Sequence, residues 1–120
     1  MGFGSAETGA GKVTVDFVRK NYTTTPLGIN ASYTSAAFAT DGYSKIVGVC
    51  FADQASATDG LEIQQSEDGT NFDLVSKFTV AANVGLGFSV EVVGTHARVK
   101  LTNSGVAQTV FRFYTFVRSM

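Results

Sequence analysis

Residues 61–80 read LEIQQSEDGTNFDLVSKFTV, and this stretch decides the fold class. The first six residues, LEIQQS at 61–66, alternate apolar and polar side chains, which is the period of a β-strand with one face in the core. EDGTN at 67–71 then contains Asp-Gly, which supplies the positive φ that tight hairpin turns require. FDLVSKFTV at 72–80 is again rich in β-branched and aromatic residues. The stretch therefore predicts an antiparallel hairpin.

Runs of the same kind continue on both sides of this hairpin, separated by clusters of Gly, Asn, Asp and Ser. The predicted strands are 13–18, one or two within 27–38, then 45–51, 61–66, 72–80, 86–92, 97–101 and 107–117. Helical periodicity is not sustained anywhere. About eight short strands at this spacing predict an all-β fold, an antiparallel two-sheet β-sandwich of jelly-roll-like or immunoglobulin-like type.

These strands form one predicted domain, residues 12–120. The preceding residues 1–11, MGFGSAETGAG, include four glycines and show almost no apolar periodicity. Such a composition favours a flexible arm, which we expect to be ordered only by a partner.

Two of the strands carry predictions about which side they bury. In 13–18, Val13, Val15 and Phe17 alternate with polar residues, so we expect these three side chains to point inward. The run KIVGVCF at 45–51 is apolar on both sides, which is typical of a strand that is covered on both faces.

The last strand predicts a contact surface. Tyr114 and Phe116 lie on the side of the strand that should face solvent, and Arg112 and Arg118 flank them. Aromatic rings beside arginine are the composition of interface cores. The alternative is that the chain's own N-terminal arm or a loop covers this face.

Charge is scarce in this chain. Nine basic and ten acidic residues give a net charge of −1, and charged residues make up 16% of the chain, against about 25% in ordinary soluble domains. Either another chain covers part of the surface, or Ser, Thr, Asn and Gln replace the charges there. We expect no nucleic-acid partner, because no basic patch is present. We also expect no membrane partner, because no apolar run approaches the length of a transmembrane helix.

Residues suited to catalysis are few. His96 is the sole histidine, which leaves no histidine pair for zinc. Cys50 is the sole cysteine, and its apolar strand indicates a buried, unreactive thiol. The motif GAGK at 9–12 is not a phosphate-binding loop, because Ala6 and Val13 stand where that motif needs glycine and Ser or Thr.

Carboxylates gather in the predicted loops, at Asp53, Asp59, Glu67, Asp68 and Asp73. Loop carboxylates can bind calcium, but Asp is also common in turns because it hydrogen-bonds its own backbone. The turn interpretation is favoured and the calcium alternative stays open. Taken together, the sequence predicts a protein that is not an enzyme and that holds no cofactor or metal.

Several short segments together carry a resemblance to a known family. They are ADQ at 52–54, IQQSEDGTNFD at 63–73, GLGFSVEV at 85–92, ARV at 97–99 and QTVFR at 108–112. Across residues 46–118 the chain resembles small β-sandwich structural proteins of tailed bacteriophages, of the capsid-associated or decoration type. The hairpin alone is also similar to that of discoidin-type sandwiches, which bind sugars and lipids.

The phage resemblance implies a virion structural protein, which decorates or cements a capsid or forms part of a vertex. Its partners would be further copies of itself, as a trimer, and other capsid proteins, and its location would be the virion. The residues that we expect at these contacts are Phe3, Arg98, Arg112, Tyr114 and Phe116.

The second resemblance implies instead a carbohydrate- or receptor-binding module, with a glycan as its partner. Tyr22, Tyr33 and Tyr43 would be the residues that stack on sugar rings. The chain has no Trp, and most of its ten Phe lie in strand patterns, which counts against this alternative.

Overall fold

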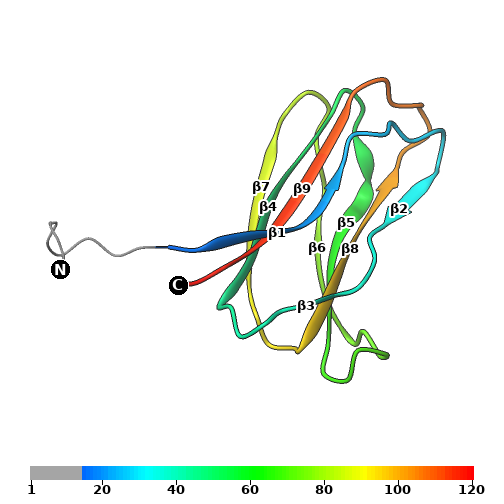
Figure 1. The fold of residues 1–120 in the computed structure, drawn as a ribbon. Helices are drawn as coiled ribbons and strands as arrows, with labels where there is room; N and C mark the ends of the chain where they lie inside the picture. The colour runs from blue at the N-terminus through cyan, green and yellow to red at the C-terminus, as the bar shows by residue number, and fades with distance from the viewer. Residues whose placement is uncertain (1–14) are drawn as a thin grey trace, which may run out of the picture.

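A computed structural model describes residues 15–120, and within them the chain forms nine strands and no helix. The strands make two antiparallel sheets that face each other as two layers (Figure 1). Their bounds are β1 Phe17–Thr23, β2 Ser32–Thr34, β3 Phe38–Ala39, β4 Lys45–Ala52, β5 Ser56–Ser66, β6 Leu74–Phe78, β7 Leu86–Glu91, β8 His96–Asn103 and β9 Phe111–Arg118. The predicted all-β, two-sheet sandwich is confirmed.

The connectivity distinguishes between the two predicted sandwich types. One sheet has the order β1-β9-β4-β7 and the other β2-β8-β5-β6, with β3 also paired to β8. Strands β2 and β3 lie along the same neighbour, so they act as one interrupted strand, and the count becomes the predicted eight. Apart from the β5-β6 hairpin, each remaining connection between consecutive strands in residues 15–120 runs from one sheet to the other. This is the jelly-roll arrangement and not the immunoglobulin one.

The core lies between the two sheets and follows the predicted alternation. Its fully or almost fully buried side chains are Ile46, Cys50, Leu61, Ile63, Phe88, Val99, Leu101, Phe111, Phe113 and Val117. Each strand therefore sends alternate residues inward. Burial raises the pKa of the Cys50 thiol to about 12, so this cysteine is an inert core residue, as predicted.

Two predictions about strand faces are wrong. Strand β1 begins at Phe17, later than the predicted start at 13, and Phe17 points outward with 56% of its surface exposed. Phe17 pairs opposite Arg118 in β9, and this pairing places the Phe17 side chain on the outer side of the sheet. Alternation within β1 alone does not say which of its two sides faces the core. Strand β4 is also not covered on both faces: Val49 is 46% exposed, because residues 15–120 leave the outer side of β4 open. Val13 lies outside the described residues.

Strand β1 contains a β-bulge that decides which of its side chains point outward. The pairing of β1 with β9 shifts between Arg19 and Asn21, which leaves Lys20 as the extra residue. The bulge reverses the alternation, so Arg19 before it and Tyr22 after it both lie on the outer side. Asn21 instead points inward and is buried, where its amide nitrogen donates to Thr115 Oγ1 over 3.3 Å.

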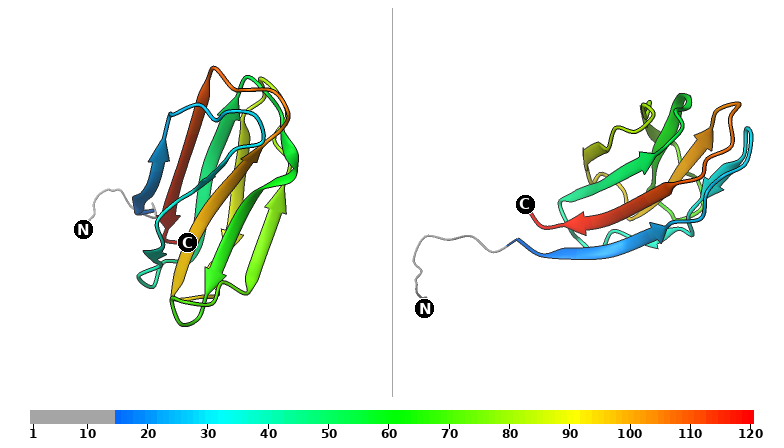
Figure 2. Two further views of the ribbon diagram at one scale, coloured as in Figure 1. Left: turned by 90° about the vertical axis from the view of Figure 1, so that its right-hand side faces the viewer. Right: turned by 90° about the horizontal axis from the view of Figure 1, so that it is seen from above.

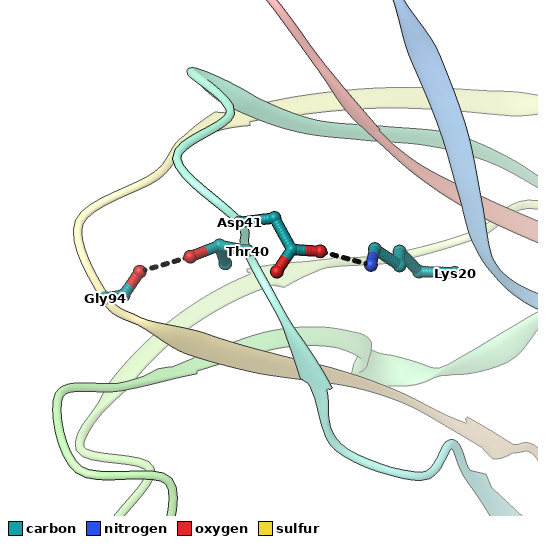
Figure 3. A network of polar contacts seen from close by, with 4 residues as sticks. All are labelled: Lys20, Thr40, Asp41 and Gly94. Atoms are coloured by element: carbon teal, nitrogen blue, oxygen red, sulfur yellow. Dashed lines mark hydrogen bonds and ion pairs between the residues drawn. The ribbon is translucent and has the colours of Figure 1, made fainter.

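A polar network fastens the bulge to neighbouring turns (Figure 3). Lys20 Nζ lies 2.8 Å from Asp41 Oδ2, in the turn between β3 and β4. In the same turn, the Thr40 hydroxyl donates to the carbonyl oxygen of Gly94 over 2.8 Å. Three chain segments that are distant in sequence are thus joined at one end of the sandwich.

Candidate assembly interface

The outer side of the β1-β9-β4-β7 sheet carries the predicted contact residues. Pairing places Val47 opposite Phe116, Val49 opposite Tyr114, and Phe51 opposite Arg112, so all these side chains point outward together. We call this surface the aromatic face. Its residues are Phe17, Arg19 and Tyr22 of β1, Arg112, Tyr114, Phe116 and Arg118 of β9, Lys45, Val47, Val49 and Phe51 of β4, and Gly87, Ser89 and Glu91 of β7.

Aromatic pairs connect the edge strand β1 to β9. Tyr22 stacks on Tyr114 with ring centroids 5.0 Å apart, and Phe17 meets Phe116 edge to face at 6.3 Å. Each such pair stabilises the sheet by about 0.5–1.5 kcal/mol beyond simple burial. Tyr114 and Phe116 are therefore half-buried by β1, while Tyr22 stays 50% exposed. Strand β1 thus covers part of this face from within the chain, whereas the alternative interpretation of the sequence named the arm or a loop as the cover.

Three arginines lie over rings of the aromatic face. The guanidinium of Arg19 is 4.9 Å from the ring centroid of Tyr22, that of Arg112 is 4.5 Å from Phe51, and that of Arg118 is 6.0 Å from Phe17. Stacking occupies the flat side of a guanidinium and leaves its N–H edge free. None of these three arginines has an ion-pair partner within residues 15–120.

A shallow groove of about 550 Å³ runs across the aromatic face. Phe17, Val47, Val49, Phe116 and Arg118 are among the residues that line it. Gly87 forms part of its floor, and a Cβ there would meet no heavy atom closer than 4.0 Å. A mainly apolar groove with Arg118 in its lining is therefore open to solvent in the isolated chain.

The structure does not bring all the predicted contact residues together. Arg112, Tyr114 and Phe116 share the aromatic face, but Arg98 lies in β8 on the opposite sheet. Its guanidinium lies 4.1 Å over the ring of Phe72, and its Nε–H donates to Gln64 Oε1. Phe3 lies outside the described residues, as does the predicted arm at 1–11.

Strand β1 adds Phe17, Arg19 and Tyr22 to this face. Phe17 and Arg19 were not predicted as contact residues from the sequence, and Tyr22 was predicted only as a residue that stacks on sugars. Residues 17–23 read FVRKNYT, and strict alternation would put Phe17 and Tyr22 on opposite sides. The bulge at Lys20 brings them to the same side. The only available signal was the abundance of aromatic and basic residues in this run.

Two of the loop carboxylates, Asp53 and Asp68, hold turns. Asp53 accepts hydrogen bonds from the Thr109 hydroxyl and from the backbone N–H groups of Val110 and Thr109, which lower its pKa to about 2. Asp68 accepts backbone N–H bonds from Asn71 and Thr70, and its pKa is lowered further. Within residues 15–120, no three His, Cys, Asp or Glu side chains lie close enough together to form a metal site.

The three residues proposed for sugar stacking differ in their exposure to solvent. Tyr33 and Tyr43 are partly buried and pack against the core, and burial raises the pKa of Tyr33. Only Tyr22 of the three is exposed, within the aromatic face. His96 is half-buried, and its Nδ1 lies 2.9 Å from the Thr95 hydroxyl.

A family described as the uncharacterised protein YqxG N-terminal domain matches residues 9–118. A search of curated protein sequences finds no match. The described part of the chain, residues 15–120, contains no helix with the length and apolarity needed to span a bilayer.

Solved structures share the fold. The crystal structure of PBSX exported protein XepA superposes with a TM-score of 0.67 at 21% identity, and the match covers 87% of this chain but only 36% of XepA. A structure described as Bacillus endospore appendages, a family of disulfide-linked pili, gives a TM-score of 0.54 at 15% identity, over 92% of this chain and 91% of the other. At these identities the likeness concerns the fold alone.

Proposed function

The chain belongs to the family of the uncharacterised protein YqxG N-terminal domain, and from that premise we propose that it is a structural protein of a tailed-phage virion. In this proposal it has no enzymatic activity. It acts as a capsid decoration, cement or vertex subunit, which self-associates and docks on other capsid proteins through the aromatic face.

The observation that carries the proposal is the exposure of the aromatic face. Phe17, Tyr22 and Val49 are each about half exposed, on the same side of one sheet. Fully burying an exposed side chain of this kind is worth roughly 1.5–3 kcal/mol, so covering the exposed half of each would contribute about half of that to binding. Rings flanked by arginine are also the composition that dominates interface energetics.

The structural neighbours support the same class of function. One is described as an exported protein of PBSX, and the other as endospore appendages that form pili. Both descriptions fit proteins that work outside the cell or as parts of larger particles. A virion location for this chain is in keeping with them.

The test is the solution mass of the purified chain and two matched variants, measured by light scattering across a range of concentrations. Phe116→Asp removes a ring from the centre of the aromatic face and puts a carboxylate into the apolar groove, where a partner would have to strip it of water. Val75→Asp makes the same change on the outer side of β6 in the opposite sheet, where it pairs with Gln64 of β5. We expect the parent chain and Val75→Asp to self-associate and Phe116→Asp to be monomeric.

Circular dichroism and thermal unfolding would establish that both variants are folded. A folded Phe116→Asp variant with the parental mass would contradict the assignment of this face. A parent chain that is monomeric at every concentration would contradict self-association.

A further inference from the structure

We infer that self-association is head to tail: the β5-β6 loop of one copy, residues 67–73, docks on the aromatic face of the next. This inference rests on the proposed function, since it requires that copies of the chain associate through the aromatic face. It adds the identity of the surface that covers that face.

The charges of the aromatic face argue against pairing with itself. The face carries Arg19, Arg112 and Arg118, and its one carboxylate, Glu91, is already paired with Lys45 at 3.0 Å. In a two-fold symmetric contact the same surface appears on both sides. The three arginines would then face a surface with no free carboxylate, and like charges would be brought together.

The β5-β6 loop has the complementary charge. Its sequence EDGTNFD contains three carboxylates and no cation. Glu67 and Asp73 are exposed, and neither has an ion-pair partner within residues 15–120. Leu74, which follows the loop, is 45% exposed and offers an apolar side chain to the groove. The loop projects beyond the lower end of the sandwich in Figure 1, where a neighbouring molecule can reach it.

Internal hydrogen bonds hold this loop in one shape. The Asp68 carboxylate accepts from the backbone N–H groups of Thr70 and Asn71, from the Asn71 side chain and from the Ser66 hydroxyl, each over 2.8–2.9 Å. Gly69 takes a φ of 81°, which glycine adopts without strain. A loop that is already ordered loses little conformational entropy when it binds.

Most carboxylates elsewhere in residues 15–120 are occupied by contacts within the chain. Asp41 pairs with Lys20, Glu91 pairs with Lys45, and Asp53 bonds Thr109. The β5-β6 loop is the part of the described chain where several carboxylates gather without a cation among them.

The arginines are suited to receive these carboxylates. Because each guanidinium already lies on a ring, its orientation is restrained. Arg19 and Arg112 are exposed, so their N–H edges are available for a bidentate contact, whereas the Arg118 Nε–H is buried. The three guanidinium groups lie 4.5–6.0 Å from their ring centroids, and Arg118 is the one of the three that lines the apolar groove. A contact between two different surfaces of the same chain leads to closed rings or to open filaments.

A charge-swap experiment tests the contact. Variant one is Arg112→Glu on the face, and variant two is Glu67→Arg with Asp73→Arg on the loop. Each alone opposes like charges, and we expect its self-association to weaken about tenfold or more. When the two variants are mixed, the acidic loop of variant one can dock on the arginine face of variant two. The basic loop of variant two can likewise dock on the face of variant one, which carries a glutamate. The mixture should therefore recover the parental mass.

Lys77→Glu, an exposed charge reversal on the outer side of β6, is the matched control and should leave the mass unchanged. The inference is overturned if the loop variant associates like the parent while Phe116→Asp is monomeric, an outcome that leaves the proposed function intact. It is also overturned if both variants are monomeric and their mixture stays monomeric. If neither Phe116→Asp nor Arg112→Glu changes the mass, both the inference and the proposed interface are wrong.

Discussion

The outer side of the β2-β8-β5-β6 sheet carries Glu62, Gln64, Arg98 and Lys100, whereas the aromatic face of the other sheet carries rings, valines and arginines. Both sheets are pleated in the same way, and both bury their inner residues in the same core. Figure 2 shows the β5, β6 and β8 layer toward the viewer in its left view. The two faces thus differ in the side chains that they turn away from the shared core.

Arginine shows what this difference means. On the polar face, Arg98 stacks on Phe72 and donates to Gln64, so it is satisfied within the chain. On the aromatic face, Arg118 also lies over a ring, but its buried Nε–H finds no acceptor among the described residues. A buried donor without a partner is costly. The presence of an arginine therefore does not identify a contact surface. What distinguishes the two faces is whether the donors of the arginine already have partners within the chain.

The largest effect is expected where the aromatic face meets the core, at two glycines on neighbouring strands. A Cβ on Gly48 would lie 2.1 Å from the carbonyl oxygen of Tyr114 and 2.5 Å from the ring of Phe88, whereas Gly87 has open space. Gly48→Ala should lower the free energy of unfolding by about 3 kcal/mol or more, because backbone has to move. Gly87→Ala should change it by less than about 0.5 kcal/mol. Urea denaturation of both variants measures the difference.

Equal stability of the two glycine variants would contradict the close packing of β4 against β9. It would also mean that the sheet beneath the aromatic face can shift without cost. The two faces could then not be treated as rigid surfaces with fixed side-chain directions.

A smaller effect is expected at the bulge that gives the aromatic face its β1 residues. The buried Asn21 amide donates to Thr115 Oγ1 and accepts from the Tyr33 hydroxyl. Asn21→Leu removes these bonds and leaves the buried Thr115 hydroxyl and the partly buried Tyr33 hydroxyl without this partner, which should cost about 1–3 kcal/mol.

A double-mutant cycle with Thr115→Val sharpens this test of the bulge. Because the two residues share a bond, the loss in the double variant should be smaller than the sum of the single losses. Strict additivity in urea denaturation would show that Asn21 and Thr115 do not interact. The hydrogen bond between these two residues could then not be what stabilises the bulge.

Most of the fold could be predicted from the sequence. Strands such as 97–101 alternate strictly, since one side must fill the core while the other meets water, and the structure places Ala97, Val99 and Leu101 fully inside. The order of strands within the sheets could not be predicted, because it depends on pairings between distant segments. The extra residue at Lys20 could not be predicted either, since a bulge leaves no mark on composition.

The candidate interface could be predicted only in part. Tyr114 and Phe116 follow from alternation in one strand, because the opposite side holds the buried Phe113 and Thr115. Arg98 was grouped with them because of its residue type, yet the topology puts it on the other sheet. Which strands share a face is a property of the whole fold, and no local pattern contains it.

The smallest effect concerns two turns that hydrogen bonds to a carboxylate hold together, and these bonds also lower the pKa of each carboxyl group. Asp53 ties the end of β4 to the residues before β9, and Asp68 orders the β5-β6 loop. A folded-state pKa below the unfolded value of about 3.9 means that each contribution to stability is present above pH 4 and is lost as the pH falls through the folded pKa. For Asp53 that pKa is about 2, and for Asp68 it is lower still.

On acidification from pH 4, the amide protons of Thr109 and Val110 should therefore lose exchange protection before those of Thr70 and Asn71. Asp53→Asn should abolish the pH dependence at the first turn and leave the second unchanged. Simultaneous loss of protection at both turns would instead indicate global acid unfolding. The two turns would then not open independently of each other.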